Sequence, residues 1–341
     1  MFEEILKAYG LPPADKIIPI NSGLINSTWK VSTSTEDFIL QKINQNVFKR
    51  PEYIDENIRL VADYMHHNYP TEIFPQLIRT HEGQTILEYK NEFFRLFSFI
   101  PGSKTIDIVR TQEQAYQAAY TFGKFTRQLN QFPLEKLHIT LPGFHDLILR
   151  NKQFKQAIKA ASPEKLKECN SLIRRLELYH FVTDIYEGIV KNKLLPLHII
   201  HHDTKISNVL FSDDDQAICP IDLDTIMPGY FVSDVGDMMR TYLSSSDENE
   251  SDLNKISVRP AFYSAIISGY TEGMQDNLND IEKKYLFYSG QFIIYMQALR
   301  FLTDYLMDDV YYGAAFPGQN ILRAENQLTL LERYNDLNLL K

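Results

Sequence analysis

The amino-acid sequence predicts an α+β protein with a small β-rich lobe followed by a larger, mainly helical lobe. Short runs of β-branched and aromatic residues fill much of the first hundred positions. Apolar residues then recur at helical spacing over most of the remainder. Pro101-Gly102 separates the two textures, so we place the lobes at residues 1–100 and 101–341 and expect any active site between them.

The first lobe contains several predicted strands and one predicted helix. The helix covers Pro51–Asn68, where apolar residues recur with a helical period and Pro51 suits the first turn. Turn signals such as Asn21-Ser22-Gly23 separate the strands. The predicted strands are Lys16–Ile20, Thr28–Val31, Phe38–Lys42, Gln76–Thr80, Thr85–Tyr89 and Glu92–Ser98.

The second lobe is predicted to be helical except at Leu197–Ile226, which looks like loops and short strands. Ser244–Asp252 is rich in acidic residues and serine, which predicts a surface loop. The predicted helices are Thr111–Gln131, Gly143–Ala161, Pro163–Lys191, Ser233–Leu243, Val258–Gln275 and Ile281 to about Met307.

Composition excludes several classes of protein. The 341 residues include 35 Lys+Arg against 44 Asp+Glu, a net charge of −9 without a dense basic run, so we expect no nucleic-acid partner. Two cysteines, Cys169 and Cys219, cannot build a disulfide framework or a four-thiolate zinc site. No run approaches the ~18 apolar residues of a membrane span. We therefore expect a cytoplasmic protein without a membrane partner. We also expect a monomer or weak homodimer, although no feature of the sequence specifies the oligomeric state.

The segment His201–Asn208 and the nearby Asp222 carry the strongest chemical signal. Phosphoryl transfer needs a carboxylate to accept a proton, oxygen ligands for Mg²⁺ and a cation near the transferred group. Asp203 supplies the carboxylate, Asn208 and Asp222 the metal ligands, and Lys205 the cation. Protein kinases place the catalytic Asp five residues before a metal-binding Asn, which is the spacing of Asp203 and Asn208.

With H-x-D-x-x-x-x-N followed by I-D-x-D at Ile221–Asp224, the sequence resembles the aminoglycoside phosphotransferase and choline kinase family. The resemblance implies a protein-kinase-like fold, ATP and Mg²⁺ as cofactors, and structural support of the catalytic loop by His201 and Asp234. The similarity is greatest to the N-acetylhexosamine 1-kinase branch. The segments that carry it are Gly23–Asn26, Phe38–Asn44, Phe144–Asp146, Ile221–Gly229 and Arg300–Leu306.

Other interpretations of these residues stay open. His201 and His202 are alternative zinc ligands, although zinc needs three or four ligands in a defined geometry. Asp234 and Asp237 are also explained as acidic residues that complement the dipole at a helix N-terminus. The chain is alternatively a nucleotide-binding pseudokinase or a metal-dependent hydrolase.

The nucleotide end of the site lacks both standard glycine fingerprints. The candidate replacement is the turn Asn21–Thr28, in which Ser22, Gly23 and Asn26 are predicted to contact ATP phosphates. An ordinary hairpin turn is the alternative.

Kinases present a lysine from the third strand to the phosphates. Here that position holds Gln41, with Lys42 beside it on the opposite face of the strand. We predict Lys42 as the phosphate anchor and Glu56 as its ion-pair partner. Phe97 and Phe99 fall in the segment that resembles the adenine-binding hinge.

The substrate end is predicted from the resemblance, which favours Arg300 as a sugar contact, with Asp203, Asp224, Tyr305 and Tyr311 as further candidates. An Arg300–Asp304 ion pair along one helix is the alternative. The implied substrate is N-acetylglucosamine or N-acetylgalactosamine, phosphorylated at the anomeric hydroxyl. Another sugar position, or a choline-, homoserine- or aminoglycoside-like alcohol, is the alternative substrate.

Overall fold

The computed structural model describes residues 1–20 and 25–337 of the chain, which fold into two compact units. The first unit comprises Met1–Asp107, Gln128–Pro142 and Ser207–Pro228. The second comprises Ile108–Arg127, Gly143–Ile206 and Gly229–Lys341. Because the two units interleave along the chain, they do not test the single lobe boundary that we predicted after residue 100. That boundary stays a prediction.

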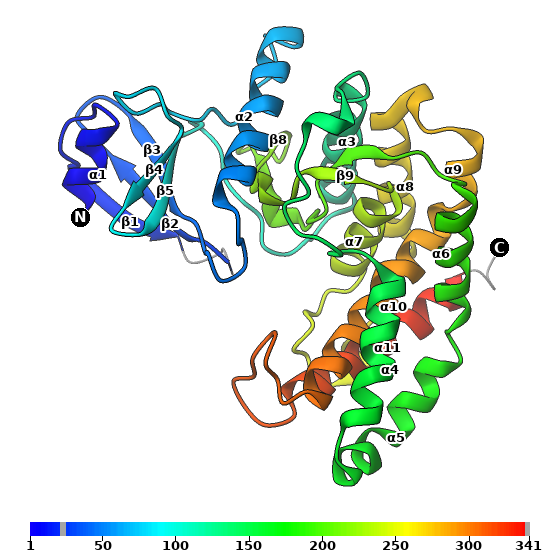
Figure 1. The fold of residues 1–341 in the computed structure, drawn as a ribbon. Helices are drawn as coiled ribbons and strands as arrows, with labels where there is room; N and C mark the ends of the chain where they lie inside the picture. Colours follow the sequence, from blue (N-terminus) through cyan, green and yellow to red (C-terminus); the bar gives the residue numbers. More distant parts are fainter. Residues whose placement is uncertain (21–24, 338–341) are drawn as a thin grey trace. The chain divides into compact units, whose positions relative to one another are not determined.

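An antiparallel sheet of five strands in the order β1-β2-β3-β5-β4 forms the centre of the first unit (Figure 1). Aliphatic and aromatic side chains alternate with polar ones, so one sheet face is apolar. The strands are β1 (Lys16–Ile20), β2 (Ser27–Ser32), β3 (Asp37–Lys42), β4 (Ile86–Tyr89) and β5 (Glu92–Ser98).

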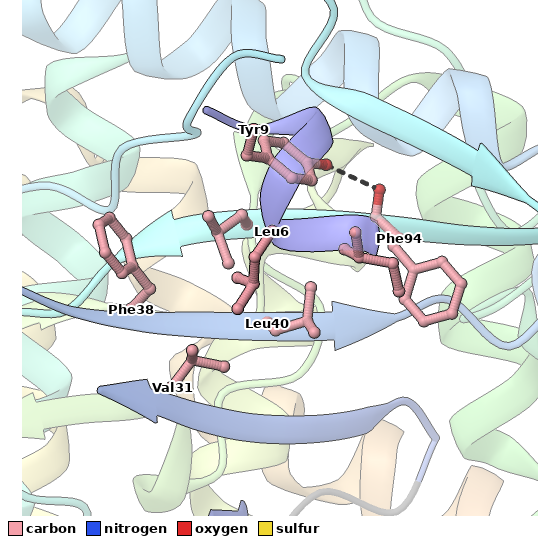
Figure 2. Packing of buried hydrophobic residues seen from close by; sticks show 8 residues of the cluster. Leu6, Tyr9, Val31, Phe38, Leu40 and Phe94 are labelled. Carbon is pink, nitrogen blue, oxygen red and sulfur yellow. Dashed lines mark hydrogen bonds between the residues drawn. The ribbon is translucent and has the colours of Figure 1, made fainter. Parts of the chain in front are cut away.

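Helix α1 (Phe2–Ala8) covers the apolar face of this sheet. Leu6 packs over Val31 and Leu40 of two neighbouring strands, as Figure 2 shows. The Tyr9 hydroxyl donates a hydrogen bond of 3.1 Å to the backbone carbonyl of Phe94. The polar atom of the Tyr9 side chain is therefore satisfied inside the cluster. Helix α1 was not predicted from the sequence.

The remaining elements of the first unit carry the polar residues discussed below. Helix α2 (Pro51–Asn68) has the bounds that its periodicity predicted. The predicted strand Gln76–Thr80 is not a full strand. It makes a single bridge from Leu77 to Phe97. Strand β4 already pairs with the first part of β5, so only the last residues of β5 can pair with this segment. The other elements are η1 (Leu134–Lys136), η2 (Ile206–Asn208), β7 (Val209–Phe211), β8 (Ala217–Pro220), η3 (Leu223–Thr225) and β9 (Met227–Gly229).

Helices form most of the second unit, as predicted, and α11 packs along α10. No helix in residues 1–20 and 25–337 is long and apolar enough to cross a membrane. The bounds are α3 (Gln112–Gln128), α4 (Leu147–Ala160), α5 (Pro163–Glu177), α6 (Phe181–Asn192), β6 (His198–Ile200), α7 (Val232–Tyr242), η4 (Leu253–Lys255), α8 (Pro260–Met274), η5 (Gln275–Asn277), α9 (Asp280–Lys284), α10 (Leu286–Leu306) and α11 (Gln319–Asp336).

Two predicted helices differ from those in the structure. The predicted helix Pro163–Lys191 is divided, because Leu178, Tyr179 and His180 each donate to the carbonyl three residues earlier and so tighten and end the turn. The predicted helix from Ile281 is interrupted at Tyr285, between α9 and α10. Helix α11 was not predicted.

Glycines allow α3 and α8 to approach each other closely. A Cβ atom added to Gly273 would lie 2.4 Å from the backbone oxygen of Tyr120, and one added to Gly269 would lie 2.4 Å from that of Tyr116. Neither backbone oxygen can move without shifting its helix, so larger residues do not fit here.

We therefore expect Gly273→Ala to lower the free energy of unfolding by about 1–3 kcal/mol, as overpacked sites do. The matched control is Gly188→Ala on α6, where an added Cβ meets no atom within 4 Å. That control should gain up to about 1 kcal/mol from helix propensity. Urea unfolding of both variants measures the difference, and equal effects would contradict the close-approach explanation.

Candidate active site

The loop that carries Asp203 is held from the start of helix α7. The backbone N–H groups of His201 and His202 donate to the two carboxyl oxygens of Asp234 at 3.0 and 2.7 Å. The Thr204 hydroxyl donates to the backbone oxygen of Asp234 at 2.7 Å, and the Tyr242 hydroxyl donates to that of Thr204 at 2.6 Å. One buried acidic residue thus fixes the backbone on both sides of Asp203.

This support maintains an uncommon backbone conformation. His202 has φ of 67°, which few residues other than glycine adopt. Its ring lies where Gly229 leaves space, since a Cβ on Gly229 would lie 2.5 Å from His202 Nε2. The resulting turn presents Asp203, and the Lys205 ammonium lies 3.1 Å from the Asp203 carboxylate. The structure therefore brings the predicted base and the predicted cation together.

Burial controls the protonation of Asp234. Removal from water raises its pKa from 3.8 to about 7, although the N–H groups of His201 and His202 stabilise the ionised form. Burial also raises the pKa of Asp237, one turn further along α7. Arg240 opposes that rise through an ion pair of 3.0 Å with Asp237. The second partner of Arg240 is Glu248 at 3.2 Å, so the predicted surface loop Ser244–Asp252 is anchored to α7.

Arg300 lies among aromatic rings in the second unit. Its guanidinium is 5.6, 5.6 and 5.3 Å from the ring centroids of Phe144, Tyr311 and Tyr312, distances typical of cation–π contacts. It also donates a hydrogen bond of 3.3 Å to the Tyr311 hydroxyl. We call Phe144, His145, Arg300, Tyr311 and Tyr312 the Arg300 cluster.

Asp304 and Tyr305 have other partners. The Asp304 carboxylate accepts the backbone N–H groups of Tyr311 and Tyr312 at 2.7 and 2.9 Å and an amide proton of Asn320 at 3.1 Å. It therefore shapes the loop that carries Tyr311 instead of forming the alternative ion pair with Arg300. The Tyr305 hydroxyl donates to Glu168 at 2.6 Å. The structure thus groups Arg300 with Tyr311 and directs Tyr305 towards α5.

The Arg300 cluster extends to the residue next to Asp203. The His145 ring stacks on Phe144, with centroids 4.3 Å apart, and lies 5.6 Å from the His202 ring. Burial, followed by the charges of His202, Arg300, Arg240 and Arg150, holds the pKa of His145 well below its usual value. His145 Nδ1 is buried without a hydrogen-bond partner in the described part of the chain. These basic groups therefore disfavour a further positive charge on the His145 ring.

The two predicted metal ligands lie in the first unit. The backbone N–H of Ile221 donates to the carbonyl of Asn208 at 2.8 Å, which joins the segments that carry Asn208 and Asp222. Asp222 has φ of 58°, in the left-handed region that aspartate tolerates better than most residues. A carboxylate and an amide oxygen suit Mg²⁺ that takes its remaining ligands from phosphates and water.

The predicted nucleotide contacts are distributed over the first unit. Ser22 and Gly23 lie outside the described residues. Asn26 donates to the Asp224 carboxylate at 2.7 Å and accepts the backbone N–H of Asn44 at 3.0 Å. Asp224, predicted as a substrate contact, is only 2% exposed.

The hinge residues also have partners in the first unit. The Phe97 ring lies 5.2 Å from the Arg95 guanidinium, and the Phe99 ring lies 3.8 Å from the Lys30 ammonium. The backbone N–H of Phe99 donates to the backbone carbonyl of Asp37 at 3.1 Å.

The predicted Lys42–Glu56 ion pair is wrong, because each residue has another partner. Lys42 binds Glu92 at 3.0 Å, and Glu56 binds His138 at 2.7 Å. Lys42 is paired with Phe94 across the sheet and so lies on the same face as the apolar cluster beneath α1. Gln41 lies on the opposite face, where its cross-strand neighbour is Arg95.

Arg95 was missed by the sequence analysis. It is a fully buried cation whose Nε and Nη2 donate to Gln41 Oε1 at 3.0 and 2.8 Å, and it forms an ion pair with Asp224. The available signal was the single arginine within the otherwise apolar stretch Phe93–Phe97 of β5, because a charged residue is rarely buried unless it has a partner.

Solved structures of similar shape identify the class of fold. A microcompartment-associated aminopropanol kinase matches with a TM-score of 0.68 and 17% identity, covering 100% of this chain and 98% of that one. A spectinomycin phosphotransferase in complex with ADP and spectinomycin matches with 0.63 and 16%, covering 98% and 97%. Choline kinase from Cryptosporidium parvum Iowa II matches with 0.52 and 15%, covering 95% and 91%. The chain thus has the kinase-like fold, with a small antiparallel-sheet lobe and a helical lobe.

The sequence itself identifies the family. Residues 16–274 match the model of the phosphotransferase enzyme family. The chain belongs to this family and is a small-molecule phosphotransferase. The N-terminal and catalytic-loop segments that carried the resemblance lie within the matched range, whereas Arg300 lies beyond it.

The raised pKa of Asp234 predicts a pH-dependent contribution to stability. Because the folded state holds this proton up to about pH 7 and the unfolded state releases it near pH 3.8, stability should fall as pH rises through this window. Asp234→Asn cannot titrate, so the wild type should lose roughly 4 kcal/mol relative to this variant between those limits. Urea unfolding across the pH range measures the difference. A difference that is constant with pH would contradict the assignment.

Proposed function

We propose that the protein is an ATP- and Mg²⁺-dependent kinase that phosphorylates the anomeric hydroxyl of an N-acetylhexosamine, N-acetylglucosamine or N-acetylgalactosamine. The observation that carries the proposal is the pair Asp203 and Lys205, which lies in a fixed turn. The preceding residue, His202, has its ring near that of His145, which belongs to the Arg300 cluster. This arrangement supplies a base, a cation and an adjacent surface for an acceptor.

Asp203 and Lys205 have separate roles in this reaction. The Asp203 carboxylate orients the acceptor hydroxyl and accepts its proton as the oxygen attacks the γ-phosphorus of ATP. Lys205, 3.1 Å from that carboxylate, lies close enough to offset negative charge on the transferred group. Asn208 and Asp222 would hold Mg²⁺, which neutralises phosphate charge when bound. Positioning by Asp234 keeps the base in place without rearrangement during the reaction.

The charge of the Arg300 cluster supports an uncharged acceptor. The guanidinium groups of Arg300, Arg240 and Arg150 act together on His145, which burial keeps neutral. These guanidinium groups disfavour a further positive charge beside His145, which supports an uncharged acceptor over choline or an aminoglycoside. The aromatic faces around Arg300 are already occupied by its own guanidinium, so they offer no vacant cage for an ammonium group. Donors such as Arg300 and the Tyr311 hydroxyl suit the carbonyl and hydroxyl oxygens of an N-acetyl sugar.

A substrate screen tests this proposal. ADP release should be Mg²⁺-dependent with N-acetylglucosamine or N-acetylgalactosamine and absent with choline and aminoglycosides. The methyl glycoside of the active sugar, which lacks the anomeric hydroxyl, should give no turnover, and the ³¹P NMR spectrum of the product should show a sugar 1-phosphate. Asp203→Asn should lower turnover by about 10²–10⁴-fold while ATP still protects against thermal unfolding. Turnover of the methyl glycoside or of choline would overturn the assigned substrate.

A second prediction concerns Arg300. Arg300→Met should raise KM for the sugar about tenfold or more and leave KM for ATP unchanged. The reason is that the variant loses the hydrogen bonds proposed between Arg300 and the sugar, and none to ATP. The matched control is Arg323→Met, since Arg323 also lies against an aromatic ring, that of Phe301 at 5.4 Å, but outside the Arg300 cluster. Steady-state kinetics with each substrate varied separately measure both effects. Equal changes in the two variants would contradict a specific role for Arg300.

A further inference from the structure

Arg95 and Asp224 form a buried ion pair within the first unit. Arg95 is inaccessible to solvent, and Asp224 is 2% exposed. Such a pair is a weak source of stability, because desolvation of both charges offsets their attraction. Loss of either partner alone leaves an uncompensated buried charge, which forces the local structure to rearrange. The pair therefore determines where its two segments lie.

The contacts of Asp224 all serve to fix its loop. One carboxyl oxygen accepts from Arg95, and the other accepts from the Asn26 amide at 2.7 Å. Its backbone oxygen accepts the Thr140 hydroxyl at 2.9 Å. Three separate segments thus hold the residue that lies two positions after Asp222, the predicted metal ligand.

Arg95 is the cross-strand neighbour of Gln41, the residue at the position where kinases carry a third-strand lysine. It lies on the same sheet face as Gln41, which stands at the usual lysine position, and it donates to that side chain twice. Asp55 of α2, next to Glu56, is also buried. Burial raises the pKa of Asp55, and the hydrogen bond from Thr85 and the charge of Arg95 counteract that rise. Glu56 and Lys42, the predicted acid and cation, have other partners.

We propose that Arg95 is a positioning residue for the metal-binding loop: through Asp224 it holds the Asp222 carboxylate where Mg²⁺ and a nucleotide are bound together. This inference rests on the proposed function, since it assumes that Asp222 is a metal ligand. Direct contact of Arg95 with a nucleotide phosphate is the competing role. Arg95 Nη1 is buried without a hydrogen-bond partner in the described part of the chain, so that role needs a separate test.

The test measures binding of adenosine, of ADP in EDTA and of ADP with saturating Mg²⁺ to the full chain by calorimetry. The main variant is Arg95→Met with Asp224→Asn, which removes both charges of the buried ion pair. Arg95→Lys is the second variant, because it retains the charge but lacks the planar fork of donors with which Arg95 bonds both Gln41 and Asp224. The matched control is Arg175→Met, which removes another Arg–carboxylate pair, to Glu332 at 2.8 Å between α5 and α11. Thermal unfolding verifies that each variant folds.

We expect the gain in ADP affinity that Mg²⁺ provides to fall about 10–100-fold in the double variant and less in Arg95→Lys. Adenosine and metal-free ADP should bind as they do to the wild type, and the control should retain the full Mg²⁺ effect. Weaker binding of ADP in EDTA with unchanged adenosine binding would show phosphate contact and overturn the positioning role. An unchanged Mg²⁺ effect would also overturn it. Failure of the wild type to bind any of these ligands would instead contradict the proposed function.

Discussion

The hydrogen bonds between the Asp234 carboxyl and two backbone N–H groups determine the geometry of the segment around Asp203. They stabilise His202 in a left-handed backbone conformation, which costs a residue with a Cβ about 1–3 kcal/mol. Burial makes this arrangement rigid, because water cannot replace either partner. Burial also brings the pKa of Asp234 to about 7, so the strength of the support depends on the protonation of one group.

Buried polar side chains assemble the first unit from segments that are distant in sequence. Asn57 on α2 binds the carbonyls of His138 and Ile226 at 2.8 and 2.9 Å. Asn26 and Arg95 both bind Asp224. A buried amide or charge without a partner is costly, so each of these side chains specifies one position for its partner segment. The segments 128–142 and 207–228 therefore belong to this unit although helices separate them from it along the chain.

The sequence allowed the fold class and most elements to be predicted, because periodicity records which face of an element is buried. Helix α2 was located to the residue for this reason. The helices at 2–8 and 319–336 were not predicted. The division at Leu178 was missed as well, because no proline or glycine marks it, and only the hydrogen bonds of the structure show it.

Site residues could be predicted where a motif of fixed spacing contains them. They could not be predicted where the pairing of two strands brings them together. Asp203 and Lys205 are two positions apart, and the structure brings them within 3.1 Å. Arg95 acts beside Gln41, 54 residues away, through a strand register that a linear pattern does not contain. Lys42 was chosen because it is the lysine next to Gln41, which holds the usual position of the kinase lysine. In the structure the cation beside Gln41 is Arg95, which comes from the neighbouring strand β5.

Net charge likewise describes the whole chain and not its sites. The chain carries −9, yet the surroundings of His145 are dominated by arginine side chains. Exposed charges more than about 8–10 Å away are largely screened by salt, whereas buried neighbours are not. The field at any one group is therefore set mainly by its few buried neighbours. A ligand's charge is recognised in the same local way, by groups that share its desolvated surroundings.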